Sequence, residues 1–254
     1  MKSLKGQRSL ITGGAVGIGK ATALALAAAG SDIAILDIDR AAAVATVVEV
    51  EKLGVRAIAL FGSVAESDAV GAAFETMDRE LGPVTILVNN AGISGNKPTL
   101  DLTDDDWNRN IGVNLNGVFF CSRAAGRRMK EAGSGCIVNV GSIYSLVAPP
   151  NRLHYAAPKA AVEMMTRALA VEWSPFGIRV NGVAPGYVKT HLLDQLVEQG
   201  RVDIDRILQR TPQRRLGTVE DVADAILYLC EPRSSFITGH MLPVDGGWVA
   251  NGFS

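Results

Sequence analysis

Short apolar runs alternate with longer, alanine-rich segments along the chain. Most of the runs are apolar without strict alternation, which is typical of parallel strands covered by helices on both faces. The segments expected to be strands are 8–12, 31–37, 55–60, 84–89, 136–141, 177–183 and, near the end, 238–244.

Helices are expected between these strands. The predicted ranges are 17–29, 40–53, 66–81, 103–132, 154–173 and 219–229. Repeated strand–helix units with right-handed crossovers give a doubly wound sheet. The sequence therefore predicts an α/β fold, a single Rossmann domain spanning 1–254 whose parallel sheet has about seven strands flanked by helices. No linker, low-complexity tract or further repeat divides it.

The helix expected at 154–173 has an unusually wide apolar belt. Lys159, Glu163 and Arg167 fall four residues apart on one stripe, and most of the other positions are apolar. Covering one sheet face needs an apolar stripe of only roughly 100°. The excess favours a second burial surface against another subunit, and the alternative is a helix buried inside the monomer.

Composition excludes several classes of protein. The chain has 254 residues, 48% hydrophobic and 20% charged, which excludes wholesale disorder. Its formal net charge of −1 offers no positive surface charge for a nucleic acid or an anionic membrane, and its 6% aromatic content argues against rows of base-stacking rings. The uncharged stretch 132–151 has the length of a membrane span but contains Asn139 and Pro149-Pro150. We expect neither nucleic acid nor membrane as a partner.

Cysteine and histidine usage argues against disulfides and metals. The cysteines are odd in number, widely spaced and form no C-x-x-C pair, which suits a reducing cytoplasm; they are Cys121, Cys136 and Cys230. The three histidines are isolated from one another and from any cysteine pair. No metal site is expected.

A glycine cluster follows the first predicted strand and opens the first predicted helix. In Thr12-Gly13-Gly14-Ala15-Val16-Gly17-Ile18-Gly19, Gly13 permits a tight turn, Gly17 lets the backbone approach a pyrophosphate and Gly19 permits close helix packing. Free N–H groups at the helix start attract phosphate. Plain tight turns also produce glycine clusters, so the flanking strand and helix strengthen the interpretation.

An acidic residue, Asp37, ends the second predicted strand about 20 residues beyond the glycines. Its carboxylate can accept hydrogen bonds from ribose hydroxyls and repels a 2′-phosphate, which favours NAD as the cofactor. The two positions where a cationic side chain could bind that phosphate hold the uncharged residues Val16 and Ile38. Arg40 lies close by, and its alternative interpretation is a solvated residue paired with Asp39.

Tyr155 and Lys159 are neighbours on one helix face, and Ser142 follows a predicted strand. Together with the glycine pattern, these residues make the chain similar to the short-chain dehydrogenase/reductase family. The similarity covers practically the whole chain and extends to Asn89-Asn90-Ala91-Gly92, Val180-Asn181, Pro185-Gly186-x-Val188-x-Thr190 and Asp245-Gly246-Gly247.

The resemblance implies a catalytic tetrad of Asn114, Ser142, Tyr155 and Lys159. Tyr155 is the expected general acid/base, and Ser142 is expected to position the substrate oxygen. A free tyrosine has a pKa of about 10; Lys159 and the positive nicotinamide ring are expected to lower that of Tyr155. Lys159 is also expected to hold the nicotinamide ribose. Asn114 is expected to disturb its helix, bind a water and link Lys159 to solvent.

The resemblance also implies cofactor contacts. Asn90, Ala91 and Gly92 are expected near the adenosine side, and Pro185, Gly186, Val188 and Thr190 around the carboxamide. The chain departs from the family pattern twice. Ser63-Val64 replaces the commoner Asp-Val, which weakens adenine recognition, and Pro158 stands in the catalytic helix. Proline is harmless only near a first turn, so the helix is expected to start just ahead of Tyr155.

The segment 188–216 is expected to form a small helical lid over the substrate. Its five arginines and four acids indicate either an anionic substrate or, at helical spacing, a solvated amphipathic helix. The expected pocket walls suit a small polyol, sugar or hydroxy-ketone: Ser94, Gly95, Asn96, Tyr144, Leu146, Val147, His154 and Tyr187. His154 has the alternative of a surface position at the helix start.

These features predict an NAD-dependent dehydrogenase that interconverts a small secondary alcohol and a ketone. One alternative is an NADPH-dependent 3-oxoacyl thioester reductase, which fits Asp37 poorly. Another is a non-catalytic NAD-binding scaffold or sensor, against which the intact tetrad argues. By resemblance, the assembly is expected to be a homotetramer joined through helices 103–132 and 154–173.

Overall fold

A seven-stranded parallel sheet forms the centre of the molecule, in the order β3-β2-β1-β4-β5-β6-β7. The computed structural model describes residues 2–190, 193 and 203–252. The strands are β1 (Arg8–Thr12), β2 (Asp32–Asp37), β3 (Ala57–Phe61), β4 (Ile86–Asn89), β5 (Gly135–Val140), β6 (Ile178–Pro185) and β7 (Met241–Val244). Every predicted strand is present, and the doubly wound Rossmann fold is confirmed.

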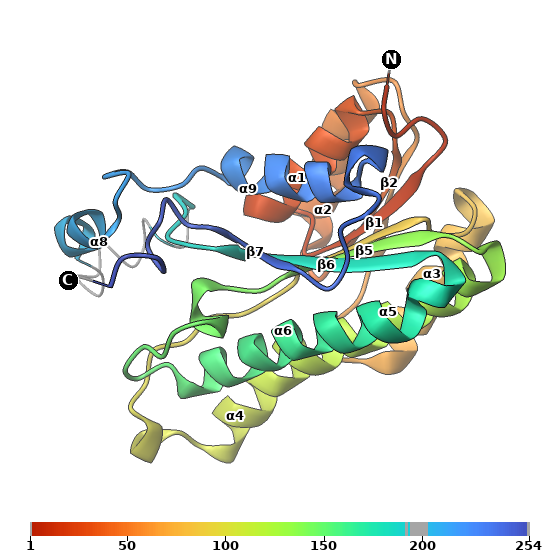
Figure 1. Ribbon diagram of the computed structural model, residues 1–254. Coiled ribbons are helices and arrows are strands. Elements are labelled where there is room, and N and C mark those ends of the chain that lie inside the picture. The colour runs from red at the N-terminus through yellow and green to blue at the C-terminus, as the bar shows by residue number, and fades with distance from the viewer. Residues whose placement is uncertain (1, 191–192, 194–202, 253–254) are drawn as a thin grey trace.

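Helices cover both faces of this sheet (Figure 1). One face carries α1 (Gly17–Ala28), α2 (Arg40–Glu51) and α9 (Val219–Cys230), and the other carries α3 (Ser67–Glu80), α5 (Gly117–Ala132) and α6 (Leu153–Trp173). Each face has its own apolar core, represented by Leu26 and Ile226 on the first and by Phe74 and Met129 on the second. Strands that pack helices on both sides explain the unbroken apolar runs in the sequence.

The strand order reverses between β1 and β4. Thr12 of β1 pairs with Leu36 of β2 on one side and with Asn89 of β4 on the other. The connections after β1 and β4 therefore leave in opposite directions and open a crevice at the carboxyl ends of the strands.

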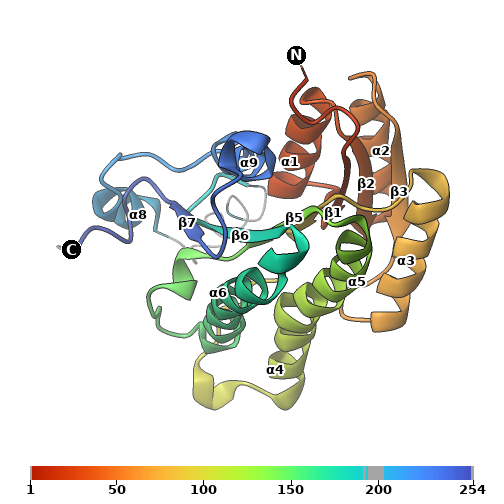
Figure 2. The same ribbon diagram turned by 45° about the vertical axis from the view of Figure 1, so that its right-hand side comes forward.

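The helix predicted at 103–132 is divided. It consists of α4 (Asp104–Ile111), a π-helical segment Gly112–Asn116, and α5. The expected disturbance at Asn114 is confirmed, because its amide bonds the backbone of Ile93 on another segment. In Figures 1 and 2, α4 lies beyond α5 and α6, away from the sheet.

Helix α6 begins at Leu153, just ahead of Tyr155 as predicted. Pro158 is nevertheless beyond the first turn, at the sixth position from Leu153, so the His154 carbonyl lacks the N–H that would bond it there. The helix continues to Trp173 despite this loss.

The remaining elements are short. Helix α8 (Ile204–Arg210) lies near the C-terminal segment in both views (Figure 2). Single 3₁₀ turns occupy Thr99–Asp101, Ile143–Ser145, Ser174–Phe176 and Pro232–Ser234. Within the described ranges, no helix combines the length and apolarity needed to cross a bilayer.

Candidate active site

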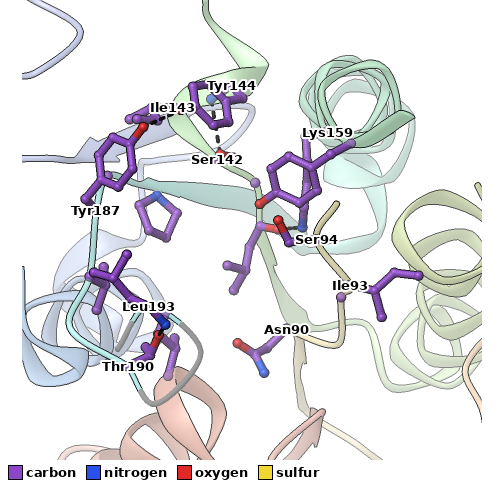
Figure 3. Close-up of a pocket in the computed structure, with 18 of the residues that line it drawn as sticks. Asn90, Ile93, Ser94, Ser142, Ile143, Tyr144, Lys159, Tyr187, Thr190 and Leu193 are labelled. Carbon is purple, nitrogen blue, oxygen red and sulfur yellow. Dashed lines mark hydrogen bonds between the residues drawn. The ribbon is translucent and has the colours of Figure 1, made fainter. Parts of the chain in front are cut away.

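A cavity of about 280 Å³ lies at the carboxyl ends of the central strands. Figure 3 shows side chains converging on it from several segments, among them Ser142, Lys159, Tyr187 and Asn90. The predicted site residues that line it are Ile18, Asn90, Gly92, Ser142, Tyr155, Lys159, Pro185, Gly186, Val188 and Thr190. The other predicted residues lie behind this wall or outside the cavity.

The glycine turn (residues 13–19) combines tight packing with one open position. A Cβ on Gly19 would lie 2.1 Å from the Gly13 carbonyl oxygen, and one on Gly13, where φ is +60°, 2.8 Å from the Ala91 Cα. Gly17 has φ +57° and nothing within 4 Å of its Cβ position. No side chain caps the N-terminus of α1. Free N–H groups beside an open glycine fit a dinucleotide pyrophosphate.

Side chains from β1 and the β4 loop hold the glycine turn. Thr12 Oγ1 accepts hydrogen bonds from the backbone N–H groups of Asn90 and Ala91, both at 3.0 Å. Asn90 Nδ2 donates to the carbonyls of Thr12 (3.0 Å) and Gly13 (2.8 Å). Asn90 therefore braces the turn, a role that the sequence analysis missed, as it missed Thr12.

Asp37 also supports the turn. Its Oδ2 accepts from Ala15 N and its Oδ1 from Asp39 N, both at 3.0 Å. Each carboxylate oxygen keeps further acceptor capacity for a ribose hydroxyl. The Arg40 guanidinium lies 4.5 Å from the centroid of the Phe61 ring, while Asp39 caps α2 through Ala42 N. The suggested Arg40–Asp39 pair is wrong, since the two side chains have these other partners.

Ser63 and Val64 lie outside the cavity lining. Ser63 Oγ accepts a hydrogen bond from Ala65 N at 3.2 Å. Val64 is buried against the start of α5, where a Cβ on Gly117 would lie 2.7 Å from Val64 Cγ2. The adenine contact stays a prediction for this pair.

Ser142, Tyr155 and Lys159 meet at the end of β5. Lys159 is buried, and its Nζ donates to the Val140 carbonyl at 2.8 Å and lies 5.8 Å from the Tyr155 ring centroid. The Ser142 hydroxyl accepts from Tyr144 N at 3.1 Å and lies close enough to the Tyr155 phenol to lower its pKa. The two side chains of the Tyr-x-x-x-Lys motif therefore share one wall of the cavity.

The net effect of the protein on Tyr155 is a raised pKa. Burial raises the pKa of this phenol, and the Ser142 hydrogen bond and the Arg152 charge only partly oppose that rise. Burial lowers the pKa of Lys159 to about 8. In the protein alone, desolvation of the phenolate outweighs the nearby donors and charge. The expected lowering by Lys159 together with the positive nicotinamide ring stays a prediction.

Asn114 lies behind the cavity wall, fully buried. Its Oδ1 accepts from Ile93 N (3.0 Å) and its Nδ2 donates to Ile93 O (2.9 Å). A Cβ on Gly92 would lie 2.9 Å from Asn114 Oδ1 and 3.6 Å from Lys159 Nζ, so Gly92 separates the two. The water relay from Lys159 through Asn114 stays a prediction.

The loop after β6 forms the opposite wall. A Cβ on Gly186 would lie 2.8 Å from the Asp245 Cα, so this glycine permits close contact with the Asp-Gly-Gly segment. Val188 bridges to Gly217, and Thr190 Oγ1 accepts from Leu193 N at 3.3 Å. Figure 3 shows Thr190 and Leu193 across the cavity from Lys159.

The expected pocket walls are only partly correct. Ser94, Tyr144 and Tyr187 line the first cavity; Asn96 and Val147 line a second cavity of about 520 Å³ beside it. Gly95, Leu146 and His154 line neither. His154 is 3% exposed, and a Cβ on Gly95 would lie 2.0 Å from its Nε2, so the surface alternative is wrong because the Gly95 loop covers the ring.

Sequence reasoning missed several lining residues. Arg152 contributes to both cavities, Trp248 to the second, and Ile93, Ile143 and Leu193 to the first. No motif or periodicity marks Arg152, which immediately precedes α6.

The arginines of segment 188–216 have different partners. Arg215 pairs with Asp221 at 2.6 Å, and Arg214 donates to the Gln209 carbonyl at 2.9 Å. Arg206 and Arg210 line the second cavity. Arg201, Asp194, Glu198 and His191 lie outside the described residues. In the part of the chain that the structure describes, no group of three or more histidine, cysteine or acidic side chains is arranged to hold a metal.

Residues 13–249 match a family model described as enoyl-(acyl carrier protein) reductase. The chain belongs to the short-chain dehydrogenase/reductase family. It is 41% identical to galactitol 2-dehydrogenase of Rhizobium johnstonii over 97% of this chain and 96% of that protein. It is 38% identical to 5-keto-D-gluconate 5-reductase of Escherichia coli K12 over 97% of each. Like these relatives, the chain is an oxidoreductase acting on CH–OH groups.

Solved structures of this short-chain dehydrogenase/reductase family share the fold closely. A gluconate 5-dehydrogenase from Burkholderia cenocepacia, in complex with NADP and tartrate, has a TM-score of 0.92 and 38% identity, covering 98% of this chain and 97% of that one. An NAD⁺-bound xylitol dehydrogenase has a TM-score of 0.92 and 32% identity, covering 96% and 99%. A nicotinamide dinucleotide is therefore the expected cofactor class, and both of its forms occur among similar structures.

Proposed function

We propose that this chain is an NAD-dependent dehydrogenase that interconverts a secondary alcohol and a ketone of a small polyol, sugar or hydroxy-ketone. The observation that carries the proposal is the convergence of Ser142, Tyr155 and Lys159 on one cavity beside the glycine turn. Asn114 lies directly behind its wall. The names of the relatives, which include galactitol and 5-keto-gluconate enzymes, support this substrate range.

The bound dinucleotide supplies the chemistry of hydride transfer at its nicotinamide. Tyr155 exchanges the proton of the substrate oxygen, and Ser142 holds that oxygen in place. Because burial raises its pKa, Tyr155 is protonated at neutral pH in the protein alone, which suits proton donation to a ketone. Lys159, fixed on the Val140 carbonyl, is placed to hold ribose hydroxyls at the same wall.

The preference for NAD rests on the end of β2. Asp37 presents a carboxylate beside the glycine turn, and its neighbours Val16 and Ile38 are exposed and uncharged. A 2′-phosphate would meet a negative charge there. Arg40, the nearest cation in sequence, is stacked on Phe61.

One assay tests the proposal against its alternatives. Purified protein is mixed with NAD⁺, NADP⁺ or NADPH and a panel of polyols, sugars, hydroxy acids and β-keto thioesters, and absorbance of the reduced nicotinamide is followed. We expect turnover of a polyol or sugar derivative with NAD⁺. Turnover confined to NADPH and a β-keto thioester would support a 3-oxoacyl thioester reductase. Dinucleotide binding without any turnover would support a scaffold or sensor.

We further propose that segment 188–216 is a lid within a single domain, 1–254. Helix α8 supports this, since its Arg206, Ile207 and Arg210 line the second cavity. Shortening α8, which leaves Val188 and Thr190 in place, is expected to raise the KM for the alcohol in steady-state kinetics while leaving dinucleotide affinity intact.

The assembly is proposed to be a homotetramer. Exposed apolar side chains support it: Met164 (59%) and Val171 (80%) on α6, and Phe119 (42%) on α5. Scattered apolar residues are ordinary, but these lie on the two helices expected to join subunits. Sedimentation equilibrium is expected to give four times the chain mass, and a monomer would refute it.

A cytoplasmic location is also proposed. All three cysteines are free and buried, which is typical of proteins kept in a reducing compartment. Fractionation of the source cells tests this, and recovery from an extracytoplasmic fraction would contradict it.

A further inference from the structure

Among the described residues that line both cavities of the site, one is charged, Arg152. The first contains Ser142 and Tyr155, and the second, about 520 Å³, extends toward α8. The residues that line both are Tyr144, Arg152 and Tyr187. A molecule that reacts at Tyr155 and extends into the second cavity would therefore pass the wall that Arg152 forms with Tyr144 and Tyr187.

The contacts of Arg152 hold its side chain without neutralising it. Arg152 Nη1 donates to Ser94 Oγ at 3.3 Å, and the guanidinium lies 5.7 Å from the centroid of the Tyr144 ring. No carboxylate among the described residues forms a salt bridge with it, whereas Arg215 is paired with Asp221. A guanidinium has five donors, so Arg152 keeps donors free for a ligand.

The surroundings of Arg152 favour an anion. Arg206 and Arg210 also line the second cavity, and among the described lining residues the one carboxylate is that of Asp203, which caps α8 through Arg206 N. Arg210 stacks on the Trp248 ring at 3.8 Å, and its buried Nε has no hydrogen-bond partner among the described atoms. The described lining of this cavity thus carries an excess of positive charge, although the whole chain is close to neutral.

Polar groups beside these cations suit hydroxyl groups. The hydroxyls of Tyr144 and Tyr187 lie 2.5 Å apart and form part of the shared wall, and the amides of Asn96 and Asn151 line the second cavity. Aromatic rings of Tyr144, Tyr187 and Trp248 pack edge-to-face around the same space. Amide and hydroxyl groups next to arginine match a carboxylate that bears several hydroxyls.

We propose that Arg152 binds the carboxylate of the substrate, and that the enzyme therefore acts on polyhydroxy acids in preference to neutral polyols of the same length. The proposal rests on the dehydrogenase function above and names its substrate class. Arg152 precedes Tyr155 by three residues at the start of α6, so the carboxylate and the reacting C–OH fit within one small molecule. Planar guanidinium donors match a carboxylate in two parallel hydrogen bonds.

The test compares pairs of substrates that differ only at C1, where the acid has a carboxylate and the alditol a CH2OH group. With NAD⁺, kcat and KM are measured for each six-carbon aldonate and its alditol, for example gluconate with glucitol and galactonate with galactitol. We expect kcat/KM for the acid to exceed that for the alditol by at least about 10-fold in the reactive pair, since hydrogen bonds to charged groups are the stronger ones. Equal values for acid and alditol would overturn the assignment but leave the dehydrogenase function intact.

Variants of the arginine separate binding from folding. Arg152→Gln is expected to raise KM for the acid about 10- to 100-fold with a smaller change in kcat, and to leave KM for an alditol unchanged. Arg152→Lys, which keeps the charge but not the paired donors, is expected to fall between. The control is Arg79→Gln, which removes a positive charge from an exposed position on α3, outside both cavities. A loss that is equal for acids and alditols would refute carboxylate recognition.

A binding measurement covers the case in which a variant folds poorly or only a neutral substrate reacts. Aldonates are then tested as competitive inhibitors of whichever alditol the wild-type enzyme oxidises, with circular dichroism to check each variant. Inhibition that Arg152→Gln weakens and Arg79→Gln does not supports the proposal. Absence of inhibition of the wild-type enzyme overturns it. Failure of the proposed function differs from both, because no polyol, sugar or hydroxy acid would then react with either dinucleotide.

Discussion

The glycine turn and the wall around Arg152 face the same cavity but are stabilised in different ways. In the turn, the side chains of Thr12, Asn90 and Asp37 bond backbone groups, and a Cβ at Gly13 or Gly19 would overlap neighbouring atoms. Around Arg152, the contacts are between side chains of separate segments, and its guanidinium keeps unused donors. The turn is thus fixed by the protein's own hydrogen bonds, whereas the wall is arranged for bonds that a ligand completes.

This difference predicts which substitutions change the rate of proton transfer, which change cofactor binding and which change substrate binding. Tyr155→Phe should have the largest effect, lowering kcat about 10²- to 10⁴-fold because proton transfer is lost while packing is kept. Dinucleotide affinity, measured by fluorescence titration, should change little. Tyr228→Phe, on α9 and outside the cavities, is the matched control. Retention of more than a few per cent of wild-type kcat by a folded Tyr155→Phe would show that another group is the acid/base.

Gly19→Ala should have the next largest effect, which is a distorted glycine turn and weaker binding of the cofactor. Its Cβ would stand 2.1 Å from the Gly13 carbonyl, so the backbone must shift away from the geometry that receives the pyrophosphate. We expect KM for NAD⁺ to rise about 10- to 100-fold, from an overpacking cost of ~1–3 kcal/mol. Gly71→Ala, in α3 with nothing within 4 Å, should instead stabilise the fold slightly in thermal unfolding. An unchanged KM for NAD⁺ in Gly19→Ala would show that the turn can accommodate a Cβ without losing its fit to the cofactor.

Asp37→Asn should produce a smaller change, in cofactor choice. The amide keeps the size of the side chain but loses the charge that repels a 2′-phosphate, and one of its atoms can no longer accept from Ala15 N or Asp39 N. The ratio of kcat/KM for NAD⁺ to that for NADP⁺ should fall about 10-fold. Asp39→Asn removes a neighbouring charge and preserves an N-cap, so its ratio should stay close to the wild type. Better use of NADP⁺ by the wild-type enzyme would contradict the role of Asp37.

The same difference explains what the sequence revealed. Strands showed as apolar runs because both sheet faces are covered, and the glycine turn showed because only glycine fits at Gly13 and Gly19. Ser142, Tyr155 and Lys159 were found because they follow strand ends and share a helix face. These are local constraints, which a sequence records directly.

Features that depend on tertiary contacts could not be predicted. His154 stands at a helix start, yet the Gly95 loop covers it. Arg152 becomes part of both cavities only because Ser94 and Tyr144, from other segments, hold its side chain. The raised pKa of Tyr155 is likewise a consequence of burial, which no spacing of residues expresses. The resemblance named candidate reacting groups, which the structure brings to one cavity, but not the electrostatic balance around them.

The smallest expected effect concerns the pKa of Tyr155, because the charge of Arg152 acts on this phenol as well as on a ligand. The groups that bear on the Tyr155 phenol are Ser142 and Arg152, which lower its pKa, against burial, which raises it; Lys159 lies at the same wall. Alcohol oxidation needs the deprotonated phenol, so activity is lost as pH falls below its pKa. In Arg152→Gln the pKa should rise, and the acid limb of the kcat/KM profile should move to higher pH.

The profile is measured with a neutral alditol, so that no substrate carboxylate screens the arginine, and Arg79→Gln again serves as control. An acid limb that stays in place would mean that the Arg152 charge does not reach the phenol once the dinucleotide is bound. A shift in Arg152→Gln that Arg152→Lys restores would instead identify charge as the cause, because lysine replaces the cation but not the guanidinium geometry. In Arg152→Lys, the preference for the acid would then be restored only partly, whereas the acid limb would return fully to its wild-type position. These two responses to one substitution separate hydrogen-bond geometry from electrostatics at this wall.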